Sequence, residues 1–108
     1  MSDDIETTVE ALSELLAAGG DLQLVDVRDD WEVAIAALPG ARHIPLPALP
    51  TALDTLDAVR PVVLLCHHGM RSLQAAIWLR QQGFEQAISV AGGIDAWSRQ
   101  IDPSVPTY

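Results

Sequence analysis

Short apolar segments alternate with helix-like segments along the chain. The clearest apolar run, residues 61–65, has no polar side chain, which is typical of a strand covered on both faces of a parallel sheet. Residues 22–27 and 87–90 have a similar strand-like character, and residues 42–45 form a brief extended piece. Because strands alternate with helices, the pattern predicts an α/β fold with a mainly parallel sheet.

Helix signals lie between these strands. Residues 72–82 give the clearest helix, which Gly83 ends. Thr7 is expected to cap a first helix, with Glu10 reaching back to it in a capping box, and Gly19 and Gly20 stop that helix. Further helices are expected over residues 31–37 after Asp29 and Asp30, over residues 47–56 with an interruption at Pro50, and over residues 94–100.

The composition is that of an ordinary globular protein. Its 108 residues, 49% of them hydrophobic, predict a single domain over residues 1–108. The only cysteine cannot form an internal disulfide, and the acidic first residues do not resemble a secretory signal. The apolar runs are also too short to span a membrane. We therefore expect a cytoplasmic protein that needs no membrane.

The formal charge of −9 argues against nucleic acid and anionic membranes as partners. This charge belongs to the first third of the chain: residues 1–32 contain ten acids and one arginine, whereas five acids and five arginines cancel in the rest. The acidic third is interpreted as a solvated face that aids solubility, or as a docking face for a basic partner protein.

Cys66 occupies the position in the sequence where reactive thiols are found. It ends the apolar run 61–65 and precedes a short loop and the helix expected over residues 72–82. Backbone N–H groups of residues 67–72 could surround its sulfur, the helix dipole adds positive potential, and Arg71 adds a full charge at the rim. Gly69 suits a tight loop. These effects favour a nucleophilic thiolate and predict sulfur or phosphate chemistry, the alternative being a buried structural cysteine.

His67 and His68 raise the question of a metal. Zinc requires three or four convergent ligands, adjacent residues seldom converge on one ion, and His43 is the only other histidine. We therefore expect no metal. The two histidines are interpreted as loop residues whose amides matter more than their rings, with some positive charge near neutral pH.

Several motifs together resemble the single-domain rhodanese family of sulfurtransferases. The matching pieces, in order, are Leu24-Val25-Asp26-Val27-Arg28 with Trp31-Glu32, Leu38-Pro39-Gly40-Ala41 with His43-Ile44-Pro45, the loop Cys66 to Arg71 with Ser72, and Val90-Ala91-Gly92-Gly93-Ile94 with Ala96-Trp97. The resemblance spans nearly the whole chain. It implies a rhodanese-like α/β fold with a five-stranded, mainly parallel sheet flanked by helices on both faces.

The resemblance also implies a two-step reaction without a cofactor. Cys66 would take sulfur from thiosulfate or a protein persulfide, and cyanide in vitro or a thiol-bearing acceptor protein would then remove it. The substrate-binding positions would be His67, His68, Gly69, Met70, Arg71 and Ser72. Asp26 and Arg28 are interpreted as structural support beside the site.

Two departures from the family pattern change these expectations. Ala36 and Ala37 stand where members commonly have a histidine, which should alter local packing and not chemistry. Arg71 is the only fixed cation in the loop. Members specialised for thiosulfate can have more, so binding of thiosulfate should be weak here and a protein persulfide becomes the more plausible donor.

Two alternatives remain open from the sequence. The first alternative is a related phosphatase or arsenate reductase. Such enzymes resemble a pattern in which five residues lie between the cysteine and an arginine, whereas four residues lie between Cys66 and Arg71. A non-catalytic interaction module is the other alternative. Trp78 lends it some support, because helical spacing places this residue beside Gln74 and away from Ile77, so its indole is either covered by another segment or available to a partner.

Overall fold

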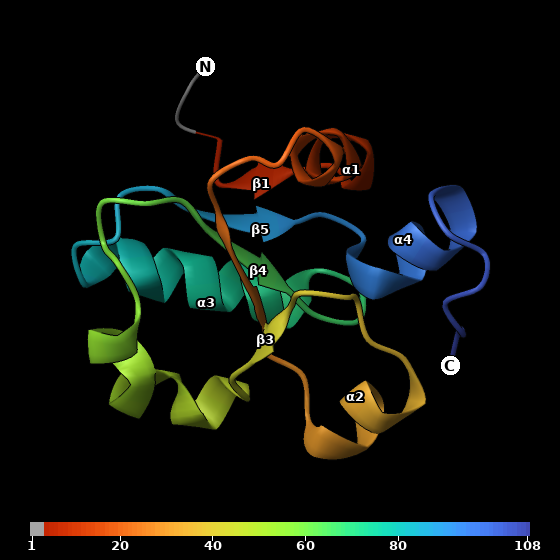
Figure 1. Ribbon diagram of the computed structural model, residues 1–108. Helices are drawn as coiled ribbons and strands as arrows, with labels where there is room; N and C mark the ends of the chain where they lie inside the picture. Colours follow the sequence, from red (N-terminus) through yellow and green to blue (C-terminus); the bar gives the residue numbers. More distant parts are fainter. Residues whose placement is uncertain (1–3) are drawn as a thin grey trace.

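Five parallel strands form the centre of the protein, as the resemblance implied. The computed structural model describes residues 4–108. The sheet has the order β1-β5-β4-β2-β3, and every neighbouring pair is parallel (Figure 1). The strands are β1 (Glu6–Thr7), β2 (Gln23–Asp26), β3 (Arg42–His43), β4 (Val62–Leu65) and β5 (Ala87–Val90). The carboxyl ends of all five strands therefore lie at one edge of the sheet, where open α/β sheets bind ligands.

Helices cover both faces of the sheet. The α-helices are α1 (Val9–Ala17), α2 (Asp30–Ile35), α3 (Met70–Gln81) and α4 (Gly93–Gln100), and a 3₁₀ segment η1 covers Leu46–Thr55. Two separate apolar clusters show which elements share a face: α3 and η1 belong to one cluster, α1 and α4 to the other. No helix within residues 4–108 combines the length and apolar character that a membrane crossing requires.

Strand β4 explains why Cys66 lies where it does. Its side chains alternate, with Val62 and Leu64 packing in the α3 cluster and Val63 and Leu65 in the cluster of α1 and α4. All four are buried, which confirms the prediction of a strand covered on both faces. Cys66 continues the alternation on the α3 side and is only 1% exposed. The thiol thus lies directly after β4, at the carboxyl end of the sheet and beside the start of α3.

The expected capping box at the N-terminus is one residue out of register. Thr7 is paired with Val90 in β1, and Thr8 caps α1 by accepting a hydrogen bond from the Ala11 amide at 3.1 Å. Pairing with a strand more than eighty residues away decides this, because it keeps Thr7 extended. Local capping signals contain no information about that distant partner.

The helix expected over residues 47–56 is a 3₁₀ segment that contains Pro50. It lies over Trp78, which is partly buried and packs against the core near Leu46 and Leu49. Ile77, which helical spacing placed on the other side from Trp78, is 46% exposed. The indole is therefore partly covered from within the chain.

Candidate active site

Backbone amides converge on the sulfur of Cys66. The Gly69 amide donates to Sγ at 3.1 Å and the Ser72 amide at 3.3 Å. Gly69 adopts a φ of 107°, a conformation that glycine tolerates and that precedes the first residue of α3. Both donors therefore point at the sulfur from the N-terminal end of a 12-residue helix, where the helix dipole favours negative charge.

A pair of buried hydroxyls extends this environment. Ser72 Oγ lies 3.3 Å from Cys66 Sγ and 2.7 Å from Ser89 Oγ, and it donates to the Gly69 carbonyl at 3.2 Å. The neutral thiol can donate to Ser72 Oγ. After ionisation, the Ser72 hydroxyl can turn to donate to the thiolate while Ser89 donates to Ser72. Ser89 was not predicted as a site residue, although a polar residue in the apolar strand 87–90 is a usable signal in the sequence.

Helix α4 holds the other side of the loop. Its first turn donates from the Ile94 amide to the Cys66 carbonyl at 2.9 Å and from the Asp95 amide to the His67 carbonyl at 3.1 Å. Gly93, with a φ of 60°, lies so close that a Cβ there would collide with both carbonyl oxygens. The carbonyls of the loop are thus bound to α4, while amides of the loop face the sulfur.

Arg71, which was expected to add a full charge at the rim, is paired with a carboxylate. Its guanidinium donates to both carboxylate oxygens of Glu32, at 2.6 and 2.8 Å, across 39 residues of sequence. These hydrogen bonds lower the pKa of Glu32 to about 2 although its burial opposes the shift. The sequence places Glu32 in a motif but contains no sign of this pairing, which depends on α2 lying beside the loop. The positive charge of Arg71 is therefore largely balanced.

Tyr108 joins the site from the C-terminal tail, through contacts with residues 76 and 80 positions earlier in the sequence. Its ring stacks on His67, with 3.9 Å between centroids and 6° between planes. Its hydroxyl donates to Glu32 at 2.7 Å and accepts from Arg28 at 2.9 Å. Burial is the main cause that raises the pKa of Tyr108 to about 12, so the phenol stays protonated near neutral pH. Trp31 makes a T-shaped contact with the Tyr108 ring, with 5.9 Å between centroids and 79° between planes.

Asp26 and Arg28 lie behind this network and are buried. The Arg28 guanidinium donates to the Asp26 carboxylate at 2.7 and 2.9 Å, and to the Ala36 carbonyl at 2.6 Å. Neither residue is placed against the sulfur. Ala36, which stands where members of the family commonly have a histidine, is buried and accepts the hydrogen bond from Arg28 with its backbone carbonyl.

The rings of the two loop histidines lie against each other at a tilt. The rings of His67 and His68 lie 3.9 Å apart at 30°, and burial lowers the pKa of His67, with His68 adding to the effect. The expected positive charge near neutral pH is thus disfavoured at His67. Asp95 brings a third donor atom within 4.8 Å of the pair, a grouping that the sequence did not suggest. Its carboxylate already accepts a hydrogen bond from Arg99 at 2.9 Å.

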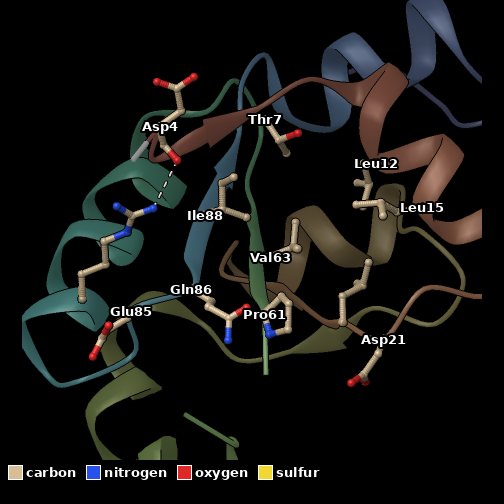
Figure 2. A pocket seen from close by; sticks show the side chains of 12 residues that line it. Asp4, Thr7, Leu12, Leu15, Asp21, Pro61, Val63, Glu85, Gln86 and Ile88 are labelled. Carbon is tan, nitrogen blue, oxygen red and sulfur yellow. Dashed lines mark hydrogen bonds between the residues drawn. The ribbon is translucent and has the colours of Figure 1, made fainter. Parts of the chain in front are cut away.

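Open volume is found elsewhere in the molecule. A cavity of about 320 Å³ lies at the opposite, amino end of the sheet, under α1 (Figure 2). Leu12 and Leu15 of α1 line it together with Val63 and Ile88 of the sheet, and Arg80 donates to the Asp4 carbonyl at 3.2 Å nearby. No cysteine or histidine lines this cavity. Its walls therefore offer neither a thiol nor an imidazole.

Comparison with known proteins places the whole arrangement in a family. The sequence pattern of the rhodanese-like domain matches residues 8–100. A sulfurtransferase of Allochromatium vinosum is 38% identical over 100 residues, covering 93% of this chain and 94% of the relative. Rhodanese-like/PpiC domain-containing protein 12, chloroplastic, of Arabidopsis thaliana is 41% identical over 92 residues, which cover 82% of this chain but 31% of that protein.

Solved structures agree with the sequence matches. The human single domain sulfurtransferase TSTD1 superimposes with a TM-score of 0.83 at 29% identity, covering 89% of this chain and 96% of that one. The chain therefore matches these relatives along nearly all of its length, and the plant protein over about a third of that protein's length.

Proposed function

The chain belongs to the rhodanese-like domain family, and on this basis we propose that it is a sulfurtransferase that carries sulfur on Cys66 as a persulfide. The observation that carries the proposal is the pair of amide donors, from Gly69 and Ser72, directed at a sulfur at the start of α3. Such donors stabilise a thiolate and equally the terminal anion of a persulfide. A cytoplasmic location stays a prediction of the sequence.

The proposed reaction has two displacements at sulfur. In the first, the Cys66 thiolate attacks the outer sulfur of a donor, forms an S–S bond and releases sulfite from thiosulfate or a thiolate from a persulfide. In the second, an acceptor nucleophile attacks the outer sulfur of the Cys66 persulfide. That S–S bond breaks, its electron pair returns to Cys66, and the acceptor leaves as thiocyanate or as a new persulfide. No electron carrier or cofactor is needed.

The surroundings of Arg71 favour a protein persulfide over thiosulfate as the donor. Thiosulfate is a dianion and gains from unpaired cations at its binding site, but the Arg71 guanidinium is engaged by both oxygens of Glu32. The same engagement argues against a phosphoryl group, whose transfer relies on such a guanidinium. Cys66 is 1% exposed, so a donor must reach it with a narrow terminal sulfur.

Intact mass spectrometry tests the proposal directly. Reduced protein should gain about 32 Da from thiosulfate or from glutathione persulfide, and cyanide should remove that mass and release thiocyanate. Glutathione persulfide should load the protein faster than thiosulfate at equal concentration. Cys66→Ser should gain no mass from either donor. Absence of loading by both donors on protein with reduced Cys66 would overturn the proposed function.

A further inference from the structure

The sulfur on Cys66 has to leave to another molecule, because the sequence has no second cysteine that could receive it. This step rests on the proposed function. The surface around the mouth of the loop then decides which acceptor can approach, and three of its properties can be read from the structure: apolar exposure, rigidity and charge.

Two large apolar side chains are exposed beside the loop. Trp31 is 61% exposed and Met70 is 76% exposed. Each directly precedes one member of the Glu32–Arg71 ion pair, whose atoms are 2.6 Å apart, so both residues belong to segments that meet at the mouth of the loop. Exposed tryptophan and methionine together are unusual on a surface that contacts only water, and both are enriched at protein interfaces.

Trp31 is also held in place before any partner binds. Its ring meets the edge of Tyr108 at 5.9 Å, and Tyr108 is stacked on His67 inside the loop and hydrogen-bonded to Glu32. An anchor that is already ordered loses less conformational entropy on binding. The indole is thus connected to the Cys66 loop through one intervening ring.

The charge beside these anchors is negative. Asp29 and Asp30 are both exposed next to Trp31, and the Asp30 side chain is 92% exposed with His43 Nδ1 3.8 Å away. Asp29 is close enough to Arg71 to contribute to the raised pKa of that guanidinium. The arginines around the loop are already paired with carboxylates: Arg28 with Asp26, Arg71 with Glu32, and Arg99 with Asp95.

We propose that Trp31, Met70 and the acidic pair Asp29–Asp30 form a docking surface, called the acceptor rim, for a thiol-bearing protein segment with basic and apolar residues next to its cysteine. The partner thiolate attacks the outer sulfur of the Cys66 persulfide, the S–S bond breaks, and Cys66 keeps the electron pair as thiolate. Basic residues complement Asp29 and Asp30, while the apolar residues pack on Trp31 and Met70.

Two synthetic peptides test the acceptor rim. Each has one central cysteine between leucines; one carries arginines on both sides and the other carries glutamates. Protein is first loaded with glutathione persulfide, and loss of the added mass is followed with each peptide and with cyanide. At low salt the arginine peptide should discharge the persulfide about tenfold faster than the glutamate peptide, an advantage that high salt should largely remove. Reaction of both peptides with free glutathione persulfide corrects for their intrinsic reactivity.

Variants then locate the effect. The rate with the arginine peptide, divided by the rate with cyanide, should fall about fivefold in Trp31→Ala and in the double variant Asp29→Asn/Asp30→Asn. Val59→Ala removes an exposed apolar side chain, 79% exposed against 61% for Trp31, from the turn before β4 at the other end of the sheet, and its ratio should equal that of the wild type.

Loading and cyanide discharge without any preference for the arginine peptide would overturn the acceptor rim and leave the proposed function standing. Failure to load would remove the proposed function instead. Wild-type self-association that Trp31→Ala abolishes would assign the surface to a second copy of the chain and would likewise overturn the proposal.

Discussion

The two ends of the parallel sheet differ in what they contain. At the amino end lies a cavity of about 320 Å³ with no cysteine or histidine among its walls. At the carboxyl end the space around Cys66 is filled by amides, hydroxyls and an ion pair, and the thiol is 1% exposed. A nucleophilic sulfur is therefore prepared by closely placed donors and not by empty volume.

The ion pairs at the two ends of the sheet differ in their exposure to water. Arg71 and Glu32 connect the loop to α2, and the Glu32 side chain is 3% exposed. At the amino end Arg60 and Asp21 are 2.7 Å apart but are 40% and 71% exposed. Water screens both members of the second pair but is excluded from Glu32 in the first, so the first pair can add more to stability and to the geometry of a site.

The largest expected effect comes from placing a side chain at Gly93, where α4 and the loop are in close contact. Gly93→Ala should cost about 3 kcal/mol or more of unfolding free energy and slow persulfide loading, because the new Cβ meets immovable carbonyls at a positive φ. Urea unfolding and mass spectrometry measure the two effects. Gly83→Ala is the matched control: its φ is 97° with open space around the Cβ, so it should cost about 1 kcal/mol and leave loading as in the wild type. Equal losses in both variants would show that the close approach of α4 is unimportant.

The second effect concerns the buried ion pair. The pKa of Glu32 falls from 4.5 to about 2 on folding, so its contribution to stability, about 3 kcal/mol, is present above pH 4.5 and is lost as the pH falls toward 2. Glu32→Gln should lose this stability at pH 7 and show a smaller loss on acidification than the wild type. Urea unfolding at pH 7 and at pH 3 makes the comparison.

Asp21→Asn at the amino end provides the reference for that measurement. Because its side chain and that of Arg60 are exposed, the substitution should change stability far less than Glu32→Gln does. Should the two substitutions cost the same, burial of Glu32 would not be the source of its contribution.

A third, smaller effect involves Tyr108, the only tyrosine in the sequence. Tyr108→Phe removes the hydrogen bonds with Arg28 and Glu32 but keeps the ring on His67, so it should cost about 1–2 kcal/mol. In the wild type the folded pKa is raised from 10.0 to about 12, so the related stability is constant below pH 10 and is lost as the pH rises toward 12. Ultraviolet absorbance reports ionisation of this single phenol; half-ionisation near pH 10 in the folded protein would contradict the buried position.

The smallest effect is expected at the amino end. Leu15→Phe adds volume beside the cavity and should change stability by less than about 1 kcal/mol, because Leu15 is 47% exposed. Persulfide loading should equal that of the wild type. A severalfold change in loading would mean that the two ends of the sheet are coupled, and the contrast between them would then no longer hold.

Local patterns predicted much of the fold. The continuous apolar run at residues 61–65 and the segment 87–90 are strands, and helices cover nearly all of residues 72–82 and 94–100. Strand β1 was missed, and with it the true cap Thr8, because a two-residue strand is stabilised by its neighbour β5 and has no pattern of its own. Pro50 was a correct warning that residues 46–55 would not form an ordinary helix.

The candidate site likewise has parts that the sequence predicts and parts that it does not. The position of Cys66 between a strand and a helix can be read directly from the sequence, as can the need for glycine at residue 69. The partners of the loop cannot. Glu32 reaches Arg71 across 39 residues, and Tyr108 reaches Glu32 across 76, so their contacts depend on how α2 and the tail pack.

The sequence alone therefore predicts the alternation of strands and helices apart from β1, the lone nucleophile, and the turn that exposes amides to it, because all of these depend on neighbours a few residues apart. The tertiary structure alone decided that Arg71 is balanced by Glu32, that Ser89 supports Ser72, and that Tyr108 stacks on His67. The physical reason is that charge pairing, burial and stacking are properties of surfaces brought together by packing, and the chain order does not specify which surfaces meet.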